Sequence, residues 1–448
     1  MRRLPILMAG LLALRPCFGQ TNTEAPLTIE RAFEMALERN EEARLADLAV
    51  KQRALLPWRS LSLLFPSLTA DASRMIPEDE IVGESGSPVV ADPTDRASLR
   101  LSQPLFSSDA YAGYRSGRSL ERAAIEDRVF RLRDLLFRVA ATFIDCLKLE
   151  HVVGINRETL TLAEEQRRTA EARYEAGEVP KTDVLRAEVE VSRARRELDV
   201  SRNQWQLAGA QLATLIGAGD GPVSVQAPPE GLADRLEHAD SLETLIAAAL
   251  EQRDDLRRAA YEREAARWSL VKARRGWWPT VSFDVEQTWA DPGSLSQPDD
   301  FWTATFRASL PLFEGGARQL DAREARYALE EADLVVSQLV KTVRLQVTEA
   351  WLRTRTARVL LDATQKELEL ARENYDVVSQ RYRAGKATSL DQVDAFTQLS
   401  RARTSVANLT YDHQAAILHL LRQVGSLGER YVADTRSEPD RSARGRTE

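Results

Sequence analysis

Two aspartates, Asp391 and Asp394, have a spacing that could support chemistry. Residues three positions apart lie on one face of a helix, so both carboxylates would point to the same side. If several copies of the chain brought this face together, the clustered carboxylates would raise one another's pKa, attract cations, bind divalent metal ions and form a cation-selective constriction. The sequence alone supports a second interpretation equally well, in which aspartates near a helix start complement the helix dipole.

Other residue types that serve catalysis lack the spacing that an enzyme or a metal site needs. The histidines lie in predicted helices without a metal-like separation, at His151, His238, His413 and His419. Each is better interpreted as a packed or exposed side chain. The chain has no glycine-rich phosphate loop and no strand-turn nucleophile. We therefore predict no catalytic residue, no dedicated metal site, no cofactor and no enzymatic activity.

A turn motif precedes Asp391 and occurs a second time in the first half of the chain. The motif Arg-Tyr-x-Ala-Gly lies at residues 173–177 and again at 381–385. In each copy the glycine suits the left-handed position after a helix, and Thr182 or Ser389 can cap the helix that follows. We therefore expect two helical hairpins with similar tips.

The duplication extends well beyond these tips. Three further matches keep the two halves in register: Leu37–Pro66 with Leu250–Pro279, Gln103-Pro104-Leu105-Phe106 with Leu310-Pro311-Leu312-Phe313, and Gly217 with Gly425. One ancestral unit of about 200 residues explains all of them. The predicted divisions are a signal peptide at 1–19, a first repeat at 20–217, a linker or equatorial segment at 218–240, a second repeat at 241–425 and a C-terminal tail at 426–448. Each repeat should hold a helix, two strands and a helical hairpin.

Composition and the first residues indicate an exported protein. The net charge of −7 argues against nucleic acid as a partner. Residues 1–19 begin with Arg2 and Arg3 and continue with a short apolar run, which is typical of a secretory signal. Lipidation of Cys17 is an alternative that we rank below simple cleavage. With only Cys146 left after cleavage, no disulfide can form within one mature chain.

The helical segments predict an extended coiled-coil body. Apolar periodicity indicates a helix from Leu27 to about Leu56, with Thr28 as its N-cap and Pro57 as its end, and the second repeat has the same pattern from Leu242 to about Ala273. No proline occurs between Pro104 and Pro180, so a helix of about 100 Å is expected there. The helix after the first tip carries a heptad seam: Val184, Ala187, Val191, Ala194, Leu198, Ser201, Trp205, Ala208, Leu212 and Leu215.

Four short segments alternate between apolar and polar residues, as strands do. Residues 280–288 and 301–310 show this strongly, and residues 67–73 and 97–102 more weakly. The four strands that they predict would be roughly 9 to 11 residues long, which suffices to cross an outer membrane when tilted. Aromatic residues near the strand ends fit an interfacial girdle: Trp277, Trp278, Trp289 and Phe301. A soluble four-stranded sheet is the alternative.

If the strands face lipid, one chain cannot complete the structure. The two edges of an open sheet would leave backbone groups unpaired in hydrocarbon, so several copies must close it. This argument alone does not fix the number of copies.

Together, the leader, the two repeats, the paired strands and the twin tips resemble the TolC family of outer-membrane efflux proteins. The resemblance covers Leu27 to about Gly425. It implies a mainly α fold with a transmembrane β-barrel, in which a homotrimer forms a 12-stranded barrel and a periplasmic α-helical tunnel. It also implies a passive channel in the outer membrane of a Gram-negative bacterium, which takes cargo from an inner-membrane pump or secretion transporter through a periplasmic adaptor.

The resemblance also implies roles for residues at the tips. Asp391 and Asp394 match an aspartate ring at the periplasmic entrance, and Asp183 and Tyr382 match a link between hairpins that helps to hold the entrance closed. The basic residue that the family places two positions after the second tip glycine is Ala387 here. The adaptor would dock on the tips, at Ala176, Gly177, Glu178, Ala384, Gly385 and Lys386.

A soluble periplasmic coiled-coil scaffold is the alternative from another functional class. It would explain the heptads, but it would not explain the aromatic girdle or the twin tips.

Overall fold

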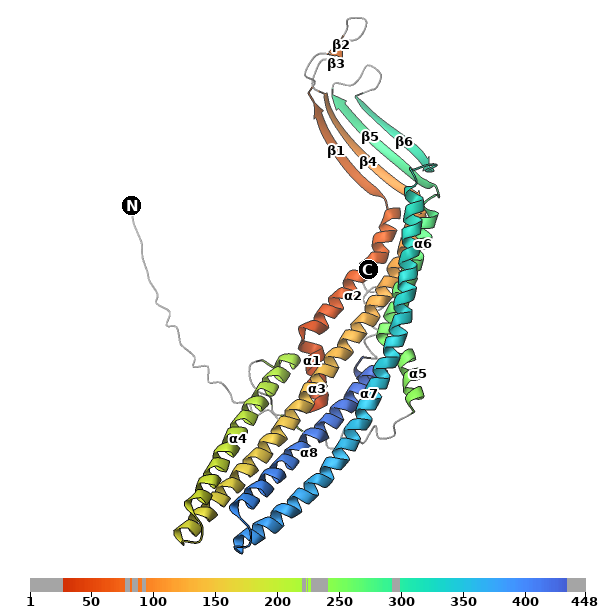
Figure 1. Cartoon of the computed structure of the whole chain (residues 1–448). Coiled ribbons are helices and arrows are strands. Elements are labelled where there is room, and N and C mark those ends of the chain that lie inside the picture. Colours follow the sequence, from red (N-terminus) through yellow and green to blue (C-terminus); the bar gives the residue numbers. More distant parts are fainter. Residues whose placement is uncertain are drawn as a thin grey trace, which may run out of the picture.

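The computed structural model describes residues 27–76, 81–82, 88–90, 94–219, 223, 225–226, 241–291 and 299–432. The predicted signal peptide with Cys17, and most of the 218–240 linker, lie outside the described residues. Within the described part, the chain forms a long bundle of helices that continues at one end into a sheet (Figure 1). Among the described residues, no helix has both the length and the apolar character that are needed to span a membrane.

The two halves of the chain have the same order of elements. The first half contains α1 (Ile29–Arg39), α2 (Glu41–Leu61), the short 3-10 helix η1 (Ser62–Leu64), β1 (Ser67–Met75), β4 (Thr94–Phe106), α3 (Ser108–Glu175) and α4 (Lys181–Ile216). The second half contains α5 (Leu242–Gln252), α6 (Asp254–Arg275), β5 (Thr280–Asp291), β6 (Asp300–Ser309), α7 (Ala317–Arg383) and α8 (Ser389–Val424). Three short elements add to these: β2 (Ile81–Val82), β3 (Pro88–Val90) and α9 (Glu429–Val432).

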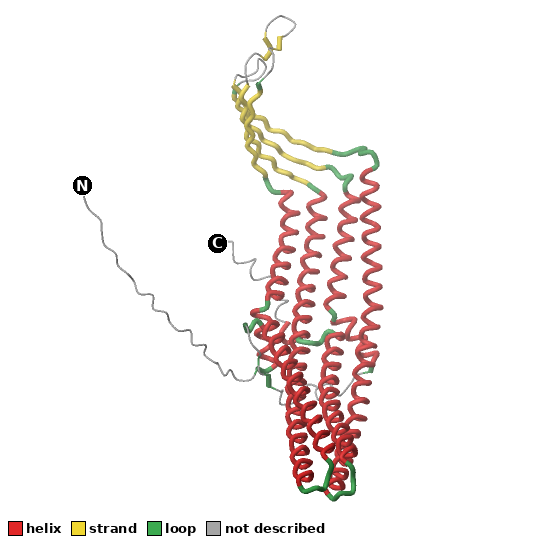
Figure 2. Tube along the Cα trace, turned by 60° about the vertical axis from the view of Figure 1, so that its left-hand side comes forward, coloured by secondary structure: helices red, strands yellow, loops and turns green. Residues whose placement is uncertain are grey.

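The long helices form two hairpins, α3 with α4 and α7 with α8, which lie side by side (Figures 1 and 2). The predicted long helix is confirmed, since α3 spans 68 residues and begins where Ser107 Oγ accepts from the Ala110 amide. The heptad seam of α4 is also confirmed, because four of its ten residues are half-buried and the other six are buried: Ala187, Ala194, Leu198, Ser201, Ala208 and Leu212. Small residues in this row let the helices approach closely.

The main core lies where α3 is surrounded by α1, α4, α8 and α9. Phe143, Leu136, Leu212 and Leu418 pack together there and are almost completely buried. The core also includes Val432 of α9. The fold therefore continues past residue 425, where the sequence predicted the tail to begin.

The prediction of one unbroken helix from Leu27 to Leu56 is wrong, although its N-cap Thr28 is confirmed. Asn40 ends α1 and caps α2, because its side chain accepts from the Glu42 amide and donates to the Leu215 carbonyl, both at 2.8 Å. Pro57 does not end the helix but lies inside α2. It packs against Gly117 of α3, where a Cβ atom would lie 2.8 Å from the proline nitrogen.

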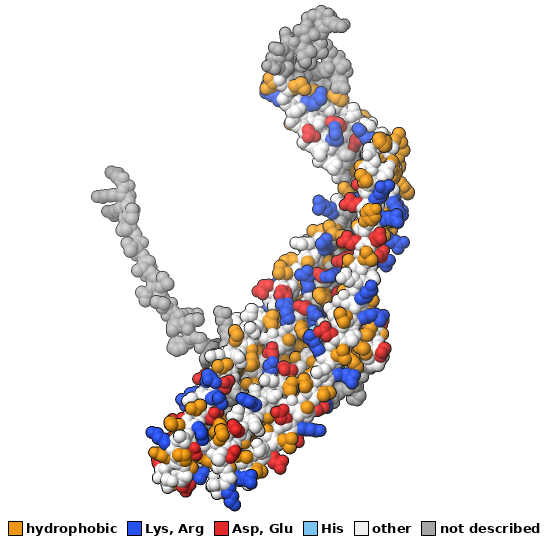
Figure 3. Space-filling model, viewed as in Figure 1, with side chains coloured by type: hydrophobic (Ala, Val, Ile, Leu, Met, Phe, Trp, Pro, Cys, Tyr) orange, Lys and Arg blue, Asp and Glu red, His pale blue; other side chains and the backbone are white. Residues whose placement is uncertain are grey.

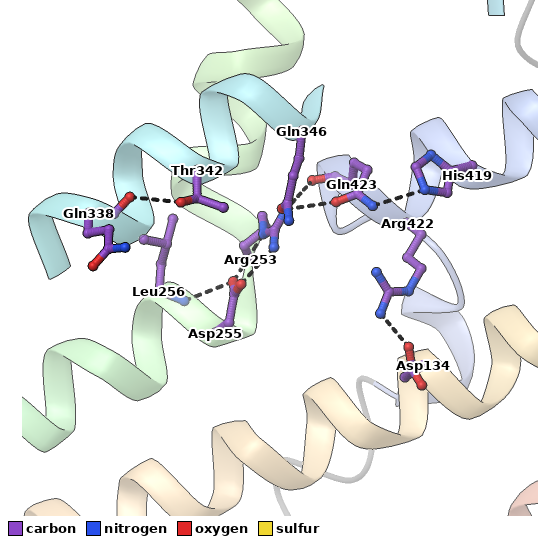
Figure 4. Close-up of polar contacts among 10 residues, drawn as sticks. All are labelled: Asp134, Arg253, Asp255, Leu256, Gln338, Thr342, Gln346, His419, Arg422 and Gln423. Carbon is purple, nitrogen blue, oxygen red and sulfur yellow. Dashed lines mark hydrogen bonds and ion pairs between the residues drawn. The ribbon is translucent and has the colours of Figure 1, made fainter. Parts of the chain in front are cut away.

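The second half breaks at the matching place, so the unbroken helix predicted from Leu242 to Ala273 is also wrong. Arg253 separates α5 from α6 and is buried. Its guanidinium pairs with Asp255 at 2.6 Å and donates to the carbonyl and side chain of Gln423 and to Gln346 (Figure 4). At each break, a side chain thus donates to a carbonyl at the C-terminal end of the helix that returns from the hairpin tip.

The four predicted strands are confirmed and form one antiparallel sheet in the order β1-β4-β5-β6. Phe283 of β5 faces Phe306 of β6, and their rings lie 4.5 Å apart. On the opposite face, Arg100 of β4 pairs with Glu286 of β5 at 2.8 Å. One face of the sheet is therefore apolar and the other is polar and charged.

Candidate functional site

The two hairpin tips have the same backbone conformation. Gly177 follows the C-cap of α3 at φ 74°, and Gly385 follows the C-cap of α7 at φ 71°. In the first tip, the Glu178 amide donates to the Arg173 carbonyl at 2.9 Å, and the Lys386 amide makes the equivalent bond in the second tip at 2.8 Å. These bonds define Schellman turns, which need a residue in the left-handed region and therefore favour glycine.

The helices that follow the two tips begin differently. Thr388 caps α8, since its hydroxyl accepts from the Asp391 amide. Pro180 precedes α4 and offers no side-chain cap. The predicted caps, Thr182 and Ser389, are therefore wrong, because both helices begin one or more residues earlier than expected.

Asp391 completes a capping box with Thr388. Its Oδ2 accepts from the Thr388 amide at 2.9 Å and from the Thr388 hydroxyl at 2.7 Å. These hydrogen bonds to the Thr388 hydroxyl and backbone lower the pKa of the Asp391 carboxyl, which is fully exposed. Asp394, one turn further along α8, is also exposed. The cap accounts for Asp391 within one chain, and the entrance-ring role of both residues stays a prediction.

Arg173 connects the first hairpin to the second. Its Nη1 donates to the Tyr382 carbonyl at 2.9 Å, and its guanidinium carbon lies 4.8 Å from the centre of the Tyr382 ring. Its Nε pairs with Glu178 at 3.0 Å. Tyr382 is only 4% exposed. Burial and the charge of Asp183 raise the pKa of the Tyr382 phenol, while Arg173 acts in the opposite direction.

A second link joins the starts of α4 and α8. The Ser389 hydroxyl donates to Asp183 Oδ1 at 2.8 Å and accepts from Arg186 at 2.9 Å. Arg186 and Asp183 are also 3.6 Å apart as an ion pair. In the contacts of the described residues, Asp183 and Tyr382 thus each bind another residue of the opposite hairpin rather than one another. Their role in closing the entrance stays a prediction.

Sequence reasoning missed Arg173 and Arg186 as members of these links. Arg173 was visible as the first residue of the repeated Arg-Tyr motif. Arg186 has a weaker signal: it stands at the position that Asp394 occupies in the second repeat.

The outermost residues of both tips are exposed and carry opposite charges. All six predicted docking residues are exposed: Ala176, Gly177, Glu178, Ala384, Gly385 and Lys386. Away from the tips, a groove of about 780 Å³ lies between α4 and α8 over α3, and its walls include Glu190, Arg193 and Arg401. Near this groove Gln166 donates to the Tyr375 hydroxyl at 3.1 Å, which holds the hairpins together at a third point.

The other titratable groups do not assemble into a reactive site. Among the described residues, no group of three or more histidine, cysteine, aspartate or glutamate side chains is arranged to hold a metal ion. His413 is buried, and His419 contacts Gln423 at 3.3 Å. Burial raises the pKa of the Cys146 thiol to about 12, so this cysteine stays protonated and unreactive.

The sheet has one apolar face and continues into long helical hairpins with exposed tips. This combination is typical of membrane proteins that have a long helical domain outside the membrane. The chain belongs to the family described as "Outer membrane efflux protein", whose model matches residues 34–218 and 245–426. It is therefore an outer-membrane transport conduit rather than an enzyme. Family membership decides against the alternative of a soluble scaffold.

Individual comparisons agree with this family. The chain is 25% identical over 345 residues to the outer membrane efflux protein BepC of Brucella suis, covering 75% of this chain and 73% of BepC. It is 25% identical over 424 residues to the pyoverdine export outer membrane protein OpmQ of Pseudomonas putida, covering 89% and 85%. The CmeC outer membrane channel of Campylobacter jejuni has the same fold, with a TM-score of 0.76, 16% identity and coverage of 99% of both chains.

Proposed function

We propose that three copies of the chain close into a passive export channel, with twelve strands in the outer membrane and a helical tunnel in the periplasm. The observation that carries this proposal is the open sheet: among the described residues, β1 and β6 each pair with one neighbour only. An unpaired edge in hydrocarbon costs several kcal/mol per backbone group, so β6 of one copy must pair with β1 of the next. The number three rests on the family resemblance.

The faces of the sheet support this placement. Leu101, Val285 and Phe306 lie on the apolar face, which would contact lipid. The opposite face carries the pair Arg100–Glu286 and the hydrogen bond from Ser102 to Asp284, and it would line a water-filled lumen.

The flanking helices support closure outside the membrane. On α7, large apolar side chains repeat every seven residues and are exposed: Leu320, Tyr327 and Leu334, then Leu345, Leu352 and Val359. The other flank has exposed apolar residues on α2 and α4, including Leu48, Leu55, Val200 and Leu207. Stripes of this kind on both sides of one chain suit lateral packing of helices between copies.

The hairpin tips form the entrance and the docking point in this proposal. The exposed carboxylates of Asp391 and Asp394 would meet their copies around the axis and make the entrance cation-selective. The links Arg173–Tyr382 and Asp183–Ser389 would hold the entrance closed. A periplasmic adaptor would contact the tips around Gly177 and Gly385, and an inner-membrane pump or secretion transporter would supply the cargo.

The test is single-channel conductance of the purified protein in planar bilayers, with divalent cations added on each side. We compare the wild type with the double variant Asp391→Asn and Asp394→Asn. Asparagine keeps an oxygen that can accept from Thr388, so the cap of α8 is largely retained while the charge is removed. The expected result is a small cation-selective conductance that divalent cations block from one side, with the block lost in the double variant.

Two results would contradict parts of this proposal. If the double variant is blocked like the wild type, the aspartates do not form an entrance ring. If folded wild-type protein never inserts, the channel itself is excluded.

A further inference from the structure

A belt of exposed apolar side chains lies at the junction between the helices and the sheet. Residues 58–66, 104–111, 272–279 and 310–318 form this belt, which appears in Figure 3 as orange and blue groups below the sheet. Leu312 and Phe313 are the most exposed, at 81% each. An apolar patch of this extent is rare on a surface that faces only water.

The net charge of the belt is positive, opposite in sign to that of the whole chain. Its four segments contain five basic residues, Arg59, Lys272, Arg274, Arg275 and Arg318, and two acidic residues, Asp109 and Glu314. The whole chain, in contrast, has a net charge of −7. Aromatic residues next to basic ones suit the boundary of a membrane with anionic head groups.

One pocket in the belt shares the residue Phe106 with the apolar face of the sheet. It has a volume of about 260 Å³, and its walls include Phe106, Arg275 and Trp278. Phe106 faces Val281 across the sheet and therefore lies on the same side as the apolar residues. Trp278 stacks on Phe106 at 6.2 Å, and the Arg275 guanidinium lies 5.2 Å from the centre of the Trp278 ring.

Arg275 differs from Lys272 and Arg318, two other basic residues of the belt, because no carboxylate in the described part of the chain binds it. Arg318 is bound by Glu314 at 2.9 Å, and Lys272 lies 4.0 Å from Asp109. Among the contacts of the described residues, the Arg275 guanidinium has the Trp278 ring but no carboxylate. The pocket also lies beside β4 and β5, the inner strands of the sheet, so pairing of copies at β1 and β6 leaves it open.

We propose that this pocket binds an anionic phospholipid of the leaflet that faces the periplasm. The lipid phosphate lies on Arg275, and the start of an acyl chain packs along Phe106 and Trp278. The inference rests on the membrane placement of the sheet given under the proposed function. One such site per chain sets how deeply the sheet inserts.

Native mass spectrometry tests this proposal on the full chain extracted from vesicles of phosphatidylethanolamine and phosphatidylglycerol in equal amounts. The wild type should retain phosphatidylglycerol preferentially. Arg275→Gln should lower the ratio of the two bound lipids about fivefold, as expected for one cation at a membrane surface. Trp278→Leu should lower it without changing the charge of the chain. Arg372→Gln, an exposed site on α7 away from the belt, is the matched control and should leave the ratio unchanged.

An unchanged ratio in Arg275→Gln, or an equal loss in Arg372→Gln, would overturn the lipid site. Conductance in bilayers without anionic lipid separates this result from a failure of the channel. If the wild type and Arg275→Gln conduct alike there, the channel stands whatever the lipid ratio shows. If the wild type does not insert, the placement of the sheet fails and the lipid site fails with it.

Discussion

Tyr174 and Tyr382 occupy equivalent positions in the two hairpin tips, yet Tyr174 is 45% exposed and Tyr382 is 4% exposed. The arginines before them differ in the opposite sense. Arg173 reaches across to the other hairpin, whereas the equivalent Arg381 is exposed. The backbone of both turns is nevertheless the same.

The aspartates that follow the tips show the same contrast. Asp183 accepts a hydrogen bond from Ser389 of the other hairpin, whereas the equivalent Asp391 bonds, among the residues that the structure describes, to Thr388 at its own helix start. Duplication therefore specifies the local turn, and the neighbouring hairpin decides what each side chain does. Each tip supplies some residues to the contact inside the chain, and the equivalent residues of the other tip, Tyr174, Arg381 and Asp391, are exposed.

The largest difference between the two tips is expected in the stability lost by the variants Tyr382→Ala and Tyr174→Ala. Removing the buried ring of Tyr382 leaves a cavity between the hairpins and should destabilise the tip by about 3 kcal/mol. Removing the exposed ring of Tyr174 should change stability by less than about 0.5 kcal/mol. Amide hydrogen exchange of the two tips measures both. Equal protection in the two variants would show that burial of Tyr382 does not hold the hairpins together.

Replacing Arg173 or the equivalent Arg381 should give a smaller difference in stability between the two tips. Arg173→Gln loses the charged hydrogen bond to the Tyr382 carbonyl and the contact with its ring, which should weaken the link by about 2 kcal/mol. Arg381→Gln removes the same charge from an exposed site and is the matched control. If the link holds the entrance closed, single-channel conductance rises in Arg173→Gln and not in Arg381→Gln. A similar rise in both would assign the effect to charge alone.

The tips show what a sequence can predict and what it leaves out. Gly177 and Gly385 were predictable because a left-handed turn after a long helix favours glycine whatever surrounds it. The contact of Arg173 with Tyr382 was not, because it depends on which helices lie side by side, and the repeats do not specify that order. The strands were predictable for a similar local reason, since alternation fixes their faces.

The breaks between α1 and α2 and between α5 and α6 were not predicted, because here the local pattern was misleading. Apolar spacing continues on both sides of Asn40 and Arg253, so the periodic pattern hid them. The local signal at the first break was an N-cap residue followed by two acids, Asn40 before Glu41 and Glu42. Arg253, also followed by two acids, is not a usual N-cap residue, and its role depends on partners from α7 and α8 that only the fold supplies.

The smallest difference concerns acid sensitivity at the helix starts. The pKa of Asp391 is lowered in the folded chain by Thr388, so its cap stabilises α8 above the pKa of the unfolded chain, near 4. That contribution is lost as the pH falls through the lower, folded value. The start of α4 has Pro180 and no such cap.

Hydrogen exchange, corrected for the intrinsic rate, should therefore show the first turn of α8 losing more protection than that of α4 between about pH 5 and pH 3. Thr388→Val removes the hydroxyl at nearly constant volume and should reduce this acid loss. An undiminished acid loss in Thr388→Val would assign it to groups outside the cap.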